Sequence, residues 1–191
     1  MNRVTCLLAA ALAIAGCQGA VPPSALPSVD GPSTGLGSSG VVMSATGGGH
    51  YRLTVLGVDA QFSLSAVQRA DGRASGQFHH KFVFDGLLID FHGEVTCMAV
   101  DSVNHRAWIG GIVKHNKSEH PDFQQAIHGE GRDLWFRILD NGEGADAPPD
   151  RTTFVGFEGA AGIRTSAEYC QRQIWPADPP NAITGNVTVR P

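Results

Sequence analysis

The sequence contains no run of about 20 apolar residues, the length that a membrane-spanning helix needs. Its first apolar stretch, residues 7–15, is too short and is followed by Gly16 and Gln18. Basic clusters are also missing, because 14 Lys and Arg are spread over 191 residues and the net charge is −4. These absences argue against a spanning helix and against binding to nucleic acid, which attracts clustered basic side chains.

Motifs for enzymatic nucleophiles and for phosphate binding are absent as well. The sequence has no G-x-S-x-G motif, no glycine-rich loop next to a lysine, and no Cys–His pairing outside a predicted disulfide. It therefore predicts no cofactor and identifies no catalytic residue.

The N-terminal segment has the features of an export signal. Arg3 precedes the short apolar stretch, and small residues precede Cys17 in the tetrapeptide Ile14-Ala15-Gly16-Cys17. This tetrapeptide resembles the lipobox of bacterial lipoproteins. The resemblance implies that residues 1–16 are a signal peptide and that Cys17 is lipidated on its sulfur and on its new amino group. A signal that is cleaved without lipid attachment is the alternative.

Two or more acyl chains would anchor the protein stably in a membrane. On the lipoprotein interpretation, Gln18 in place of Asp implies passage to the outer membrane, with the protein facing the periplasm or the cell surface. Residues 17–46 are rich in Pro, Ser and Gly and predict a lipidated, unfolded tether of about 30 Å. We expect a hinge at Gly47–His50 and one folded domain over residues 47–191.

Two of the four cysteines remain for the folded domain, because Cys6 lies in the signal and Cys17 would carry lipid. The remaining two are Cys97 and Cys170, and an oxidising compartment favours a disulfide between them. Two free, buried thiols are the alternative.

Apolar residues alternate with polar ones along most of the domain, with the period of two that is typical of strands. One hairpin is predicted around a turn at residues 70–73, and a second around a turn at residues 101–105. In the second hairpin, one face is expected to carry Ile89, Phe91, Gly93, Val95, Cys97 and Ala99.

Further strands are expected at residues 134–138, 152–157 and 183–190. The only helix candidate is Pro121–His128, and a loop is the alternative for this segment because eight residues are marginal for a helix. This pattern of about eight strands without βαβ spacing predicts an all-β fold, an antiparallel β-barrel with at most one short helix. A two-sheet β-sandwich is the alternative.

Three residues are candidates for contact with a ligand. Strand parity places His80 on the inner face with Phe78 and Phe82, whereas His92 and Glu94 share the opposite face. An imidazole and a carboxylate together could perform acid–base chemistry. Satisfied core or surface residues are the simpler interpretation of all three.

Metal binding is weakly indicated at two segments. Asp140, Glu143, Asp146 and Asp150 form an oxygen-rich loop, but they lack the spacing of a calcium-binding loop. The histidines of residues 115–131 fit no zinc pattern and are expected to be solvated. We therefore predict no metal site and interpret the acidic loop as a structural turn.

Landmarks along the domain are Gly47–His50, Gly93–Cys97, Trp108–Gly111, Asp140–Gly144 with Pro148–Asp150, and Gly185–Val189. Together they resemble a family of exported bacterial domains without assigned activity. The resemblance implies a β-rich extracytoplasmic domain with a Cys97–Cys170 bridge, and it assigns no catalytic residue. Residues 115–131 look like an insertion relative to that family.

The function expected from these features is that of a lipid-anchored binding domain for a small molecule, a glycan or an envelope partner. A hydrolase or isomerase that uses histidine and glutamate in the barrel is one alternative, and a structural envelope protein is another. A wide polar lumen would favour the enzyme, an apolar lumen the binding domain, and a filled lumen the structural protein.

The lipoprotein interpretation makes Cys17 indispensable for anchoring. We expect that Cys17→Ser leaves the protein uncleaved or releases it from lipid, because the thiol is the acylation site. Membrane fractionation measures this outcome, and a processed, detergent-phase Cys17→Ser protein would contradict it.

Overall fold

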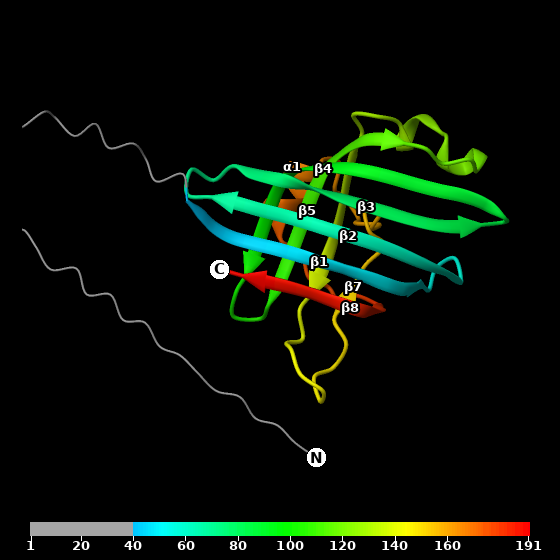
Figure 1. The fold of residues 1–191 in the computed structure, drawn as a ribbon. Coiled ribbons are helices and arrows are strands. Elements are labelled where there is room, and N and C mark those ends of the chain that lie inside the picture. The colour runs from blue at the N-terminus through cyan, green and yellow to red at the C-terminus, as the bar shows by residue number, and fades with distance from the viewer. Residues whose placement is uncertain (1–39) are drawn as a thin grey trace, which may run out of the picture. The chain divides into compact units, whose positions relative to one another are not determined.

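The computed structural model describes residues 40–191, which form a closed antiparallel barrel (Figure 1). Each strand pairs with the next in chain order, and the last strand pairs with the first. The barrel prediction is therefore confirmed over the sandwich. The strands are β1 (Val41–Leu53), β2 (Val58–Arg69), β3 (Ala74–Phe84), β4 (Leu87–Asp101), β5 (Arg106–Asn116), β6 (Asp133–Leu139), β7 (Arg151–Thr152) and β8 (Asn181–Arg190).

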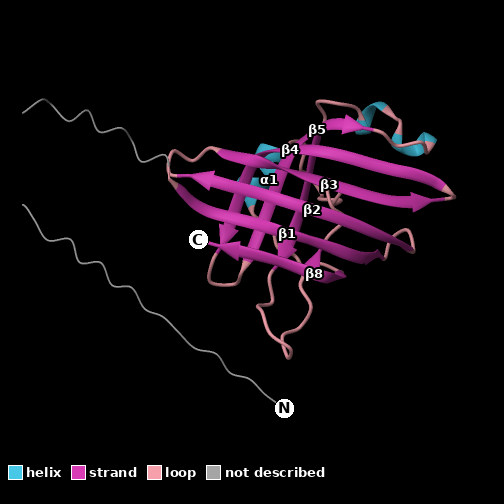
Figure 2. Cartoon of the chain, in the orientation of Figure 1, coloured by secondary structure: helices cyan, strands magenta, loops and turns pink. Residues whose placement is uncertain are grey.

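Within residues 40–191, helical structure is confined to three short segments (Figure 2). These are the α-helix α1 (Ser166–Arg172) and two 3₁₀ turns, η1 (Pro121–Phe123) and η2 (Ala126–His128). In the described part of the chain, no helix has the length and apolar character needed to cross a membrane.

The interior of the barrel is filled by the apolar residues that alternate along the strands. Their side chains form one continuous cluster, and the rings inside it meet mostly edge to face. Such packing removes large apolar areas from water and accounts for most of the driving force for folding. The aromatic members of the cluster are Tyr51, Phe62, Phe78, Phe82, Phe91, Phe123 and Phe136, with Phe84, Phe154 and Phe157 packed against it.

The predicted hairpin turns at residues 70–73 and 101–105 are confirmed. Asp71 accepts a hydrogen bond from the Arg73 amide, and Asp101 accepts from the amides of Val103 and Asn104. These are the local carboxylate–backbone bonds that make aspartate common in turns.

A third hairpin joins β3 to β4 through Asp85 and Gly86. Both residues have positive φ, 50° and 78°, as a two-residue type I′ turn requires. This turn fixes the register of the two strands, so that His79 lies directly opposite His92.

The predicted face of β4 is wrong beyond Val95, because the strand contains a β-bulge. The register with β5 shifts between Val95 and Cys97, so that Thr96 is an extra residue. Val95 points into the core, but Cys97 and Ala99 lie on the outer face, opposite Gly110 and Trp108. An inserted residue reverses the alternation of every side chain that follows it.

The sequence analysis did not predict α1, which covers the outer face of β4 and β5. The helix has only seven residues, and Thr165 caps its N-terminus by accepting from the Glu168 amide. Its Cys170 is disulfide-bonded to Cys97, which confirms the predicted pair. Gly110 permits this close approach, because a Cβ there would lie 2.5 Å from the Cys97 sulfur.

Residues 121–128 do not form the predicted helix. They fold into η1 and η2, and Phe123 is buried against Phe82, Phe91 and Phe157 at one end of the barrel. Ile127, expected to share a face with Phe123, is 63% exposed. A helix of eight residues is marginal unless other contacts support it, as the Thr165 cap and the disulfide support α1.

Two further segments differ from expectation. β1 begins at Val41, so residues 41–46 belong to the sheet and not to the tether, and Gly47–His50 lies inside a strand. The strand expected at 152–157 is limited to β7. The signal, Cys17 and the tether up to residue 39 lie outside the described residues.

The disulfide joins β4 to a helix that follows 73 residues later. Replacing both cysteines by alanine should lower the free energy of unfolding by about 4 kcal/mol, because the unfolded chain gains loop entropy. Urea denaturation measures this loss. Non-reducing peptide mapping under acid quench should recover the Cys97–Cys170 peptide, and freely alkylated thiols would contradict the bridge.

Candidate functional site

The barrel wall separates the three residues that the sequence singled out as ligand contacts. His80 points into the core and is fully buried, whereas His92 and Glu94 lie on the outer face. The predicted faces are therefore correct for all three. However, His80 cannot act on the same bound molecule as the other two.

His80 is held by the core. Its Nε2 forms a 2.8 Å hydrogen bond with the Tyr51 hydroxyl, which also accepts a hydrogen bond from the Val155 amide. Burial, together with neighbouring His79, lowers the pKa of His80 to about 3. The imidazole is neutral at physiological pH and links β3 to β1.

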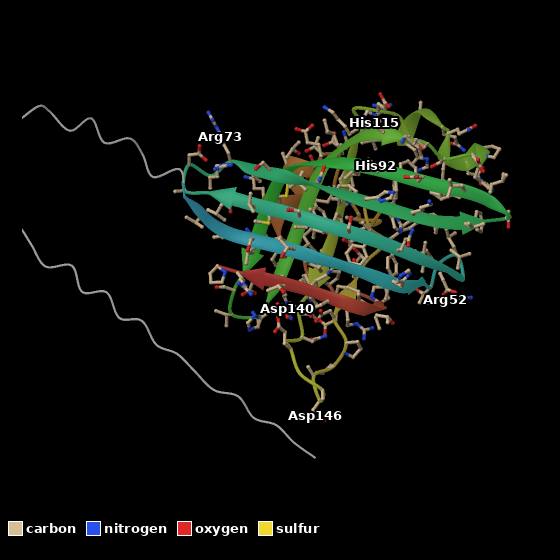
Figure 3. The ribbon with its side chains drawn as sticks, viewed as in Figure 1. Arg52, Arg73, His92, His115, Asp140 and Asp146 are labelled. Atoms are coloured by element: carbon tan, nitrogen blue, oxygen red, sulfur yellow. A yellow bond between two sulfur atoms is a disulfide. The ribbon has the colours of Figure 1, made fainter. Side chains whose placement is uncertain are left out.

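A cleft of about 540 Å³ lies on the outer face of β3, β4 and β5. Its ionisable side chains come from all three strands: His79 from β3, His92 and Glu94 from β4, and Lys114 and His115 from β5. Ser63 of β2 lines one side. Figure 3 shows His92 and His115 together on one side of the barrel, whereas Asp140 and Asp146 lie on the opposite side.

Strand register forms the row of histidines in this cleft. His79 is opposite His92 across the β3–β4 pair, and His92 is opposite His115 across the β4–β5 pair. Ser63 continues the row on β2, opposite His79. Side chains that are directly opposite on one face lie close enough to interact.

Asp90 precedes His92 by two residues and shares its face. Its carboxylate Oδ1 lies 2.8 Å from His79 Nε2 and 3.3 Å from His92 Nε2. The two imidazole rings are stacked, with centroids 4.1 Å apart. Among residues 40–191, these three side chains are the only group of at least three with a geometry that could hold a metal ion.

Backbone hydrogen bonds fix Asp90 in this position. Its amide donates to the Ser118 hydroxyl, and its carbonyl accepts from the Lys117 amide. The segment that follows β5 therefore folds back along β4 and holds the aspartate beside the two histidines.

Partial burial, together with the nearby positive charge of His79, Lys117 and His115, lowers the pKa of His92, whereas Asp90 opposes this shift. The neutral imidazole is therefore favoured at His92. The neutral form is the one that can accept a proton or bind an electrophile.

The remaining charges of the cleft form exposed ion pairs. Lys114 donates to Glu94 at 3.1 Å, and His115 lies 3.4 Å from Glu130. Exposed pairs of this kind contribute little to stability and are easily exchanged for a ligand. They leave Lys114 and His115 available at the border of the cleft.

The sequence analysis missed the roles of His79 and Asp90. The signal that could have found them is the Asp85-Gly86 turn, because residues equidistant from a two-residue turn face each other. Counting back from it pairs residue 79 with residue 92. Spacing rules for zinc motifs do not detect ligands that come together across strands.

The acidic loop after β6 is used for structure. Asp150 accepts from the amides of Asn141 and Val187, and Asp140 accepts from those of Gly142 and Val189. These bonds attach the loop to β8. The carboxylates of Glu143 and Asp146 are exposed, and the four residues do not converge.

The histidines of the insertion-like segment have structural contacts. His120 is buried and accepts from the Asp122 amide, which contradicts the expectation that it is solvated. His128 lies 2.9 Å from the Asp122 carbonyl and stacks on Phe123, and burial lowers its pKa. Only His115 is exposed at the cleft.

Comparison of the chain with family models, with curated proteins and with solved structures found no match. The resemblance to exported bacterial domains therefore stays a prediction, and the candidate site is defined by its geometry alone.

The buried carboxylate of Asp150 predicts a specific loss of stability. Asp150→Asn should lower the free energy of unfolding by about 1–3 kcal/mol, because the new amide group leaves a buried backbone amide without an acceptor. Asp146→Asn, at an exposed position of the same loop, should change it by less than about 0.5 kcal/mol. Urea denaturation of both variants measures the difference.

Calcium provides a second measurement on this loop. Millimolar calcium should leave the melting temperature unchanged, because backbone amides already occupy the Asp140 and Asp150 oxygens. A rise of more than about 4 °C, absent in Asp140→Asn, would contradict a purely structural loop.

Proposed function

We propose that this protein is a lipid-anchored, extracytoplasmic binding domain that takes a small polar molecule or ion on the outer face of its barrel. The observation that carries the proposal is the contrast between the two sides of the sheet. The interior is filled by apolar and aromatic side chains, whereas the outer face of β3 to β5 has a cleft bordered by ionisable groups.

The size and lining of the cleft favour a small polar ligand. About 540 Å³ lies within the range of small-molecule sites. His79, His92, Glu94 and Lys114 offer both hydrogen-bond donors and acceptors there. A ligand with charged or hydroxyl groups would exchange water and weak ion pairs for hydrogen bonds with these side chains.

The two alternatives are less well supported. An enzyme with its site in the lumen would need access to His80, which is sealed in the core. A filled interior favours a structural envelope protein, but a structural role offers no reason for a concave row of histidines that also holds a carboxylate. The proposed anchor at Cys17 would tether the domain to a membrane.

A tryptophan in place of Ser63 tests the proposal, because its ring would cover the cleft beside His79. Native mass spectrometry of the full chain, purified in mild detergent, should show a bound small molecule or ion. The Ser63→Trp variant should lose this extra mass.

Thr184→Trp is the control, since it adds the same ring at an exposed position on β8 that does not line this cleft. It should keep the bound mass. Equal retention in both variants, or no bound species in the unmodified protein, would contradict the proposed function.

A further inference from the structure

Two imidazole nitrogens from the cleft lining and one carboxylate oxygen beside the cleft converge on the outer face. The side chains of His79, Asp90 and His92 place one potential ligand atom each within 4.8 Å of the others. Both Nε2 atoms face the same oxygen, Asp90 Oδ1, at 2.8 and 3.3 Å. They come from two paired strands of a closed barrel, so the backbone holds them rigidly.

We infer that His79, Asp90 and His92 form a binding site for a divalent first-row transition-metal ion such as zinc. This inference rests on the proposed function, in which the outer face is the binding face, and it names the ligand class. A metal ion would take the place of the two contacts that now join the imidazoles to the carboxylate.

The distances suit a tetrahedral ion. Ligand atoms about 2.0–2.2 Å from zinc are about 3.3 Å apart in a tetrahedron. The separation of 3.3 Å between His92 Nε2 and Asp90 Oδ1 matches this value, whereas the His79 contact is shorter at 2.8 Å. Because the two rings are stacked and a nitrogen lone pair lies in the plane of its ring, metal binding requires both imidazoles to turn about their side-chain bonds until the two Nε2 atoms point at one ion. The hydrogen bonds that hold the Asp90 backbone to Ser118 and Lys117 limit the rearrangement to the side chains.

The ligand set selects the kind of metal. Imidazole nitrogen suits zinc, copper, nickel and iron, whereas calcium and magnesium require oxygen ligands. Two histidines and one carboxylate therefore exclude calcium as the preferred ion.

Three protein ligands leave a coordination position open. The side chains of His79 and His92 are 35% and 41% exposed, so water or an external donor can reach an ion between them. His115 lies opposite His92 on the next strand but is not one of the three converging residues. It provides an internal control, because it is an exposed histidine in the same cleft.

Isothermal titration of the full chain in detergent with zinc chloride tests the site. One ion should bind per chain, with a Kd of micromolar or below, and calcium chloride should give no binding heat. His79→Ala, His92→Ala and Asp90→Asn should each raise the zinc Kd by at least about tenfold. Even substitutions of residues that only hydrogen-bond to a metal ligand weaken metal binding by about this factor. His115→Ala should stay within about threefold of the unmodified protein.

Visible absorption of the Co²⁺-loaded protein gives an independent readout. The intense bands of a tetrahedral Co²⁺ site should be present in the unmodified protein and in His115→Ala, and absent in His92→Ala. Melting curves without metal should be alike for all variants, because the substituted side chains lie on the outer face and outside the core cluster.

Three outcomes would overturn the metal site: no saturable zinc binding below about 100 μM, an equal loss of affinity in His115→Ala and His92→Ala, or a zinc Kd that is unchanged in His79→Ala. Failure of zinc binding would leave the proposed function standing if a copurified small molecule is displaced by Ser63→Trp. The absence of both metal and small molecule would reject the proposed function as well.

Discussion

Closure of the sheet through the pairing of β1 with β8 is the constraint on which the rest of the structure depends. In a closed ring, every strand residue faces either the interior or the outside. The interior is filled by large side chains from all around the ring, and their burial stabilises the fold. The cleft of the described domain lies on the outer face.

The outer face is divided into a covered part and an open part. The C-terminal segment covers the end that carries Cys97 and Trp108, where α1 is fixed by the disulfide and Trp175 packs edge-on against Trp108. Beneath the Trp175 ring, Arg137 forms an ion pair with Glu158 at 2.6 Å, and both side chains are almost fully buried. The other end, over β3 to β5, is left uncovered by residues 40–191 and contains the cleft with its histidines.

Two neighbouring histidines show how a strand of the barrel places adjacent residues in different environments. His79 and His80 are adjacent, yet one faces the cleft and the other the core. Burial removes the charged state of His80 and leaves it a structural partner of Tyr51. His79 retains contact with solvent and with Asp90, so it is the histidine that a ligand can reach.

Local sequence signals determined much of the fold. The period of two gave most of the strands, and the Asp-containing turns at 70–73 and 101–105 gave two hairpins, because both depend on neighbouring residues only. Alternation also predicted the faces of the three candidate residues, with His80 inward and His92 and Glu94 outward. The cysteine pair could be predicted because few alternatives remained.

Only the tertiary structure decided barrel against sandwich, because closure depends on the pairing of strands that are far apart in the chain. The bulge at Thr96 reversed the faces of Cys97 and Ala99, which alternation by itself could not anticipate. The His79–Asp90–His92 cluster likewise depends on the register between two strands. Such a site is specified by which residues face each other across a sheet, and the linear spacing of the sequence does not record that pairing unless the turn is known.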